Sequence, residues 1–299
     1  MKKQMISAAE LLLTALIWGV AFVAQSVGME YIGPFTFNCV RSLIGGIVLI
    51  PLILVLRKIN QKTFPSEDEK YLYRKNTVMG GIFCGLIFVI ATNFQQFGIM
   101  YTTVGKAGFI TALYIVIVPV LGIFLKKKVA PIVWVSCVIA IIGFYMLSIS
   151  GQVGINQGDI LVLVAALLFS LHILVIDHFS PRGDSVGISC IQFLVSGVVS
   201  GICMFLFENP QIGQILDAYV PILYAGVMSC GVAYTLQIVG QKNMDPTVAC
   251  LILSMESVFS ALAGWVILGE RLKPRELFGC VLVFAAVLLA QLPTNTGKE

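Results

Sequence analysis

The sequence predicts an all-α integral membrane protein in which ten transmembrane helices form two inverted five-helix repeats around a central cavity. Three observations predict this fold: the composition, ten apolar segments of bilayer-spanning length, and internal similarity between the two halves. Of the 299 residues, 58% are hydrophobic and 11% are charged, and the mean hydropathy is +0.96. About a quarter of the residues are charged in ordinary soluble proteins, so most of this chain requires lipid as its solvent.

Ten segments reach the length of about 20 residues that a helix needs to cross the hydrocarbon core. They occupy residues 7–26, 35–56, 77–100, 106–125, 130–149, 158–177, 186–207, 218–239, 247–268 and 275–292. Short polar links separate them, and the longest link runs from Arg57 to Lys75. No link has room for a soluble domain, so the chain divides only into two repeats, residues 1–149 and 158–292.

The lysines and arginines of the links predict the orientation, because these residues are concentrated on the cytoplasmic side of membrane proteins. If both termini lie inside, the cytoplasmic links hold most of the cations, including Lys126-Lys127-Lys128. The opposite links then hold only Lys106, Arg271, Lys273 and Arg275. We therefore expect a multi-pass protein of the cytoplasmic membrane of a prokaryote, with both termini in the cytoplasm. The net charge of +4 belongs to these links, and no pattern of a nucleic-acid-binding groove accompanies it.

The two halves resemble each other at a constant spacing. A shift of 142 residues matches Gln95 with Gln237 and places Tyr114 opposite Glu256, and a shift of 151 residues relates the earlier helices. Because each half contains an odd number of spans, the second half must lie inverted in the membrane. Inverted repeats are typical of carriers that expose a midplane site alternately to either side.

Glu256 is the main candidate functional residue. It lies near the middle of segment 247–268, about 14 Å deep at 1.5 Å per residue. A carboxylate at that depth is costly, so it usually faces a partner or a wet cavity and marks a substrate or ion path. Loss of hydration favours its protonated form, which suits a proton carrier, and its charged form suits a cationic substrate. The alternative is a structural carboxyl group bonded to a neighbouring helix.

Polar side chains in other spans are further candidates for substrate binding. The amides of Asn93, Gln95 and Gln237 can donate and accept hydrogen bonds, which suits a zwitterion, but amides also join membrane helices structurally. Arg41 is expected either to extend its charge to the outer surface or to pair with Glu256 in the cavity.

Aromatic and histidine side chains complete the set of candidates. Trp18 and Tyr114 could stack on a substrate, although aromatic residues in membrane helices more often pack or form the interfacial belt. His172 could relay protons or be a satisfied core histidine. Because His172 and His178 are the only histidines, we expect no metal site, and no cofactor is expected.

Several short motifs follow one another along the chain: Trp18-Gly19, Pro34, Arg41, the run from Phe109-Ile110-Thr111 to Pro119, Glu256, and Gly269-Glu270-Arg271. In the order and spacing of these motifs, the chain resembles the EamA-like branch of the drug/metabolite transporter superfamily. In that family the residue after the glutamate is often proline, whereas here it is Ser257. The resemblance implies a ten-helix secondary transporter, commonly an exporter of amino acids, other metabolites or toxic compounds. It also implies that helices 1, 3, 4, 6, 8 and 9 surround the cavity, with helices 5 and 10 outside.

We therefore expect a secondary or facilitative exporter of a small amphipathic metabolite that alternates around Glu256. Its expected partners are a small-molecule substrate and the lipid bilayer, with proton coupling and a homodimer both left open. A primary pump is disfavoured because the chain contains no P-loop. Two alternatives remain: an intramembrane enzyme acting on lipid or peptide, for which HExxH and GxSxG motifs are lacking, and a non-transporting assembly or sensor protein.

Overall fold

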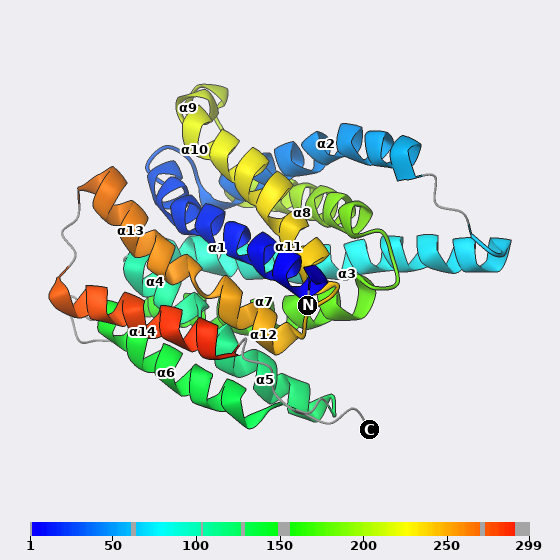
Figure 1. Cartoon of the computed structure of the whole chain (residues 1–299). Coiled ribbons are helices and arrows are strands. Elements are labelled where there is room, and N and C mark those ends of the chain that lie inside the picture. Colours follow the sequence, from blue (N-terminus) through cyan, green and yellow to red (C-terminus); the bar gives the residue numbers. More distant parts are fainter. Residues whose placement is uncertain are drawn as a thin grey trace.

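The computed structural model describes residues 2–60, 64–102, 104–126, 129–148, 156–269 and 273–290. Within these ranges the chain is helical apart from turns and short links (Figure 1). Eight described helices are long and apolar enough to cross a membrane, and two shorter apolar helices span Pro131–Met146 and Leu277–Ala290. Glu270-Arg271 of the last motif and Lys127-Lys128 lie outside the described residues.

The first three helices are α1 (Lys2–Gly28), α2 (Pro34–Asn60) and α3 (Glu67–Ile99). The link expected over residues 57–75 is wrong at both ends, because α2 and α3 both extend into it. Ser66 starts α3 in an extended conformation, and its side chain accepts a hydrogen bond from the Glu69 amide at 3.2 Å. Three acidic residues also occupy the first turn of α3, where the helix dipole favours negative charge.

The fourth apolar segment forms two helices, α4 (Val104–Thr111) and α5 (Tyr114–Phe124). At the break, the Leu113 amide donates to the Ile110 carbonyl at 3.2 Å, the tight bonding of a 3₁₀ turn. Pro119 predicts a kink in this segment, yet α5 continues through it. The Ile115 carbonyl, which a proline at 119 cannot bond, accepts instead from Cys137 Sγ at 3.2 Å.

The ninth segment is broken in the same manner, into α12 (Pro246–Leu253) and α13 (Glu256–Leu268). Here the Met255 amide donates to the Ile252 carbonyl at 3.1 Å. No proline lies at this break. Ser257 bonds across to α4, with its Oγ donating to the Gly108 carbonyl at 2.8 Å. Gly269 ends α13 in the left-handed conformation, at a φ of 69°.

The eighth segment, 218–239, follows the short helix α9 (Ile212–Asp217) and begins with another short helix, α10 (Tyr219–Leu223). It then runs through a π-helix, η1 (Tyr224–Ala233), into α11 (Tyr234–Gln241). π-Helical turns are uncommon and are frequent at functional sites. The π-helix packs against α1 and α2.

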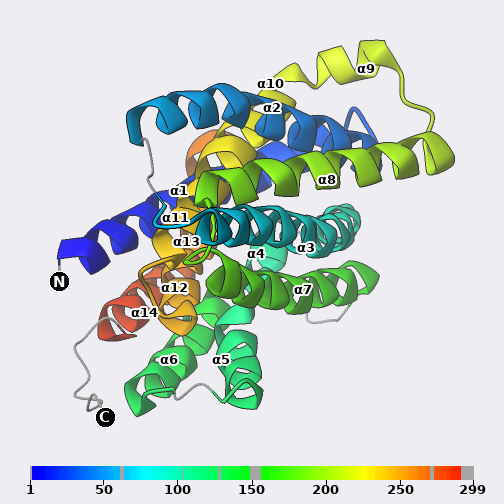
Figure 2. The same ribbon diagram turned by 90° about the vertical axis from the view of Figure 1, so that its right-hand side faces the viewer.

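The remaining helices are α6 (Pro131–Ser148), α7 (Gln157–Phe179), α8 (Ser185–Phe207) and α14 (Pro274–Ala290). α6 and α14 pack along each other at one side of the bundle. In Figures 1 and 2, α6 lies at the lower edge and α14 just above it. α2 lies along α8, and α3 lies between α7 and α8. The two broken segments, α4–α5 and α12–α13, contact each other and pack against α1 and α7.

Candidate functional site

A hydrogen bond between the two broken segments lies at the centre of the site. Tyr114 is the first residue of α5 and Glu256 is the first residue of α13, and both side chains are 3% exposed. The Tyr114 hydroxyl donates to Glu256 Oε1 at 3.0 Å. As the first residue of α13, Glu256 also stands where the helix dipole favours a negative charge.

A cavity adjoins this hydrogen bond, and its walls come from α1, α2, α3, α4, α5, α7, η1, α11, α12 and α13. The lining residues are Trp18, Ala21, Phe22, Gln25, Arg41, Gln95, Thr111, Tyr114, Phe169, His172, Ile173, Ser229, Tyr234, Gln237, Leu253 and Glu256. The volume open to the centres of water molecules is about 30 Å³, whereas one water needs about 10–15 Å³. In this conformation the cavity has room for about two waters, and a larger ligand requires the helices to move apart.

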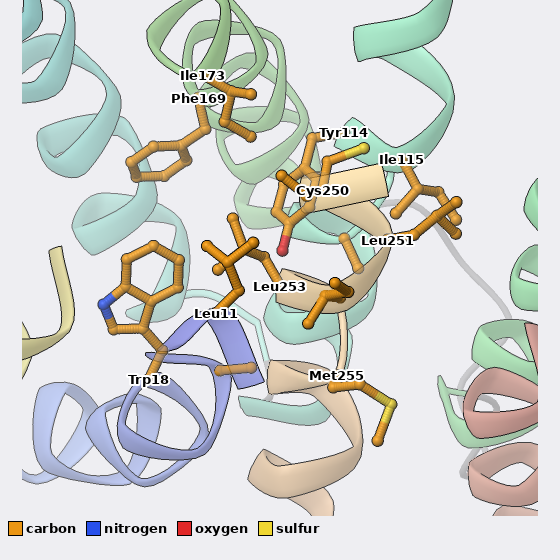
Figure 3. Packing of buried hydrophobic residues seen from close by; sticks show 14 of the residues in the cluster. Leu11, Trp18, Tyr114, Ile115, Phe169, Ile173, Cys250, Leu251, Leu253 and Met255 are labelled. Carbon is orange, nitrogen blue, oxygen red and sulfur yellow. The ribbon is translucent and has the colours of Figure 1, made fainter. Parts of the chain in front are cut away.

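One wall of the cavity is aromatic. The rings of Trp18 and Tyr234 lie 4.4 Å apart between centroids, tilted by 52°. Figure 3 shows Trp18 of α1, Phe169 of α7 and the Tyr114 hydroxyl reaching into the region between their helices. Trp18 Nε1 is buried and has no hydrogen-bond partner. This wall offers ring faces and one unused donor.

Arg41 lies in the cavity wall without an acidic partner. Its side chain is 3% exposed, so it does not extend to the outer surface. Nη1 donates to Gln25 Oε1 at 3.1 Å, and the guanidinium carbon lies 5.5 Å from the Phe37 ring centroid. Among the described residues no ion pair joins Arg41 to Glu256, and the Glu256 carboxyl group accepts from Tyr114 instead.

The predicted amides are divided between the cavity and the helix interfaces. Gln95 lines the cavity and donates from Nε2 to Thr111 Oγ1 at 3.1 Å. Gln237 also lines it, with its buried Oε1 unbonded. Asn93 is not among the lining residues; its Oδ1 accepts from Asn38 Nδ2 at 2.9 Å. Asn93 therefore joins α3 to α2, whereas the two glutamines face the site.

His172 belongs to both the cavity and a helix interface. It lines the cavity, and its Nε2 lies 2.7 Å from Gln192 Oε1 of α8. The same histidine packs 5.8 Å from the Phe88 ring centroid. This hydrogen bond provides a partner for a buried histidine. The described residues include no group of three or more His, Cys, Asp or Glu that could hold a metal ion.

Sequence patterns did not single out several lining residues. Gln25 binds Arg41, Ser229 lies in the π-helix, and Phe169 and Tyr234 supply aromatic rings. Gln25 carried a usable signal, because it is a polar residue inside a predicted span. Thr111 carried another, because it belongs to the Phe109-Ile110-Thr111 motif. Ser229 carried none, since a small polar residue in a membrane helix is common.

Comparison with known proteins relates the whole chain to one family. The sequence profile of the EamA-like transporter family matches residues 5–149 and 156–292. An uncharacterized transporter of Archaeoglobus fulgidus is 31% identical over 283 residues, which cover 94% of this chain and 84% of the relative. The uncharacterized transporter YoaV of Bacillus subtilis is 22% identical over 280 residues, 92% of each protein. A solved crystal structure with 18% sequence identity covers 96% of both chains at a TM-score of 0.76, which shows a shared fold.

Proposed function

We propose, since this chain belongs to the EamA-like transporter family, that it exports small metabolites such as amino acids, or toxic amphipathic compounds. Family membership and the apolar helices make it a multi-pass membrane transporter. The proposal adds a direction, a substrate class and a mechanism. The mechanism is alternating access, in which a site near the bilayer midplane opens first to one side and then to the other.

The proposed architecture is ten spans in two inverted five-helix repeats. The positions of the helix breaks support it. α4 ends at Thr111 and α5 begins at Tyr114, whereas α12 ends at Leu253 and α13 begins at Glu256. Each bound in the second half is 142 residues after its counterpart, the shift at which the sequences of the two halves match. Broken helices at the interface of two repeats are a recurrent feature of secondary transporters.

The hydrogen bond between Tyr114 and Glu256 is the observation that carries the proposal. It joins the two halves through the first residues of α5 and α13, inside a cavity with polar and aromatic walls. A buried carboxyl group in such a place usually serves an ion or substrate path. We propose that Glu256 either carries a proton or binds a cationic group of the substrate, and that Tyr114 holds it between transport steps.

The small volume of the cavity supports a closed intermediate of the cycle. About 30 Å³ is open to the centres of water molecules, so an amino acid fits only after α4–α5 and α12–α13 separate further. The two 3₁₀ turns at the breaks are the backbone positions where such movement is expected, because mid-helix 3₁₀ stretches often mark hinges.

Transport into membrane vesicles tests this function. Inside-out vesicles from overexpressing cells are supplied with labelled amino acids and lipophilic amines, at several pH values, for the wild type and Glu256→Gln. We expect uptake by the wild type to depend on pH and uptake by Glu256→Gln to be reduced at least about tenfold, as for loss of a charge-assisted contact. Glu30→Gln, which changes an exposed carboxyl group, is the matched control and should transport normally. Unchanged, pH-independent transport by Glu256→Gln would remove Glu256 from the mechanism.

A further inference from the structure

Arg41 is a buried cation with unused donors. A guanidinium group has five N–H donors and is always charged. In the described part of the chain, Arg41 donates one hydrogen bond, from Nη1 to the neutral amide oxygen of Gln25 at 3.1 Å. Nε is buried and has no hydrogen-bond partner. Polar groups buried in this way usually find partners, so the missing partner requires an explanation.

The fold itself does not require a cation at this position. The shift of 151 residues places Gln192 opposite Arg41, so the corresponding place in α8 holds a neutral side chain. Gln192 Oε1 lies 2.7 Å from His172 Nε2, while Gln192 Nε2 is buried without a hydrogen-bond partner in the described part of the chain. The Phe37 ring at 5.5 Å offers Arg41 a cation–π contact, which offsets burial but leaves the N–H donors unbonded. A purely structural role would be served by a second glutamine.

The position of Arg41 in the cavity wall supplies the explanation. Arg41 lines the cavity that also contains Glu256, Trp18 and Tyr234. Resting on the proposed transport function, we propose that Arg41 binds a carboxylate group of the transported ligand and selects for it. The planar guanidinium group can donate two parallel hydrogen bonds to one carboxylate. These charge-assisted bonds are stronger than a hydrogen bond to a neutral amide such as Gln25.

Charge also orients the ligand. Arg41 attracts an anionic group, whereas the Glu256 carboxyl group, held by Tyr114 at 3.0 Å, repels one when ionised. The carboxylate therefore lies at the Gln25 and Arg41 end, and a neutral or cationic remainder points toward Glu256. Arg41 repels a compound that carries only a positive charge, so the site is expected to bind simple lipophilic amines weakly.

A thermal-unfolding experiment with matched ligand pairs tests this role. The purified full-length protein in detergent is titrated with propionate against propionamide, and with alanine against alaninamide, with inorganic phosphate as a further anion. A ligand that binds the folded state raises the unfolding midpoint according to its occupancy. We expect the acids to stabilise the wild type and the amides to have little effect. Arg41→Gln should weaken acid binding about tenfold or more, and Arg41→Lys, which keeps the charge without the fork, should fall between them.

Arg74→Gln is the matched control, because it removes an exposed arginine that does not line the cavity; its acid preference should equal that of the wild type. Any one of four outcomes would overturn the proposal. In the first two, acids and amides stabilise the wild type equally, or no acid stabilises it. In the other two, phosphate stabilises it more than the acids do, or the acid preference survives in Arg41→Gln. If Arg41→Gln does not fold, the acid–amide contrast in the wild type and the behaviour of Arg41→Lys decide the question. Vesicle transport that depends neither on the acid group of the ligand nor on Arg41 would remove this role of Arg41 and leave the transport function standing. Acid binding through Arg41 without any vesicle transport would keep the carboxylate-binding role and remove the transport function.

Discussion

At the scale of single residues, loss of the Tyr114 hydroxyl is predicted to slow transport, whereas loss of a buried hydroxyl that does not line the cavity is not. Tyr114→Phe leaves Glu256 Oε1 without its donor at 3.0 Å, so we expect a stability loss of about 0.6–2 kcal/mol and slower transport. Tyr224→Phe removes a similar bond, to the Ile17 carbonyl at 3.1 Å, away from the cavity. It should cost comparable stability and leave transport intact. Thermal unfolding in detergent and vesicle uptake measure the two effects, and equal transport by both variants would contradict the prediction.

Some contacts of the site residues could be predicted from the sequence, and others could not. The repeat register put Tyr114 opposite Glu256, and the structure joins these two side chains directly. For Arg41 the sequence predicted either exposure at the outer surface or a pair with Glu256. The contact with Gln25 was missed because it depends on how α1 and α2 are rotated about their own axes. Asn93 and Gln95 lie two positions apart on α3, and only rotation of the helix decides that Gln95 lines the cavity.

At the scale of helices, the Ser257 hydroxyl is expected to hold α13 against α4. Its Oγ donates to the Gly108 carbonyl at 2.8 Å, across 149 residues of sequence. Ser257→Ala should lower the free energy of unfolding by about 0.6–2 kcal/mol. Ser254→Ala is the control, because that hydroxyl bonds only locally, to the Leu251 carbonyl at 2.7 Å, and local bonds of this type add little to a helix. A larger loss in Ser254→Ala, measured by thermal unfolding, would contradict the assignment.

The close contact between α2 and the π-helix depends on Gly226. A Cβ at this position would lie 2.8 Å from Ile44 Cβ and 3.1 Å from the Arg41 carbonyl oxygen. Gly226→Ala must therefore displace α2, and we expect a loss of about 1–3 kcal/mol together with weaker transport, because α2 positions Arg41. At Gly213 of α9 an added Cβ meets nothing within 4 Å, so Gly213→Ala should be neutral or slightly stabilising. Equal unfolding midpoints for the two variants would contradict the proposed contact.

The helix breaks could not be predicted from local sequence. Apolar length located the fourth and ninth segments, but neither Ala112-Leu113 nor Ser254-Met255 contains glycine or proline, the usual signals of interruption. Pro119 does carry such a signal, yet α5 continues through it, and the Ile115 carbonyl accepts from Cys137 Sγ. Local patterns thus place a span well, while packing against neighbouring helices decides where its backbone bends.

At the scale of the whole molecule, composition was sufficient to predict a multi-pass membrane protein, and eight described helices meet the length and hydropathy of a span. The two remaining segments form shorter apolar helices, α6 and α14, which pack along each other. Their predicted segments, 130–149 and 275–292, both extend to residues outside the described ranges. The count of ten spans and the inversion of the halves thus depend on topology, which length and hydropathy do not fix.

Inversion predicts that two equivalent links lie on opposite sides of the membrane. The link after α5, near Val129, corresponds to the link after α13, which begins at Gly269. An epitope tag inserted after Val129 of the full-length chain should be hidden from antibody in intact spheroplasts and become accessible after permeabilisation. A tag inserted after Gly269 should be accessible in both conditions, as expected when most lysines and arginines face the cytoplasm. Since an odd number of spans per repeat requires this opposition, tags accessible on the same side would contradict the inverted arrangement. They would also remove the symmetry that relates Tyr114 to Glu256 in the proposed transport cycle.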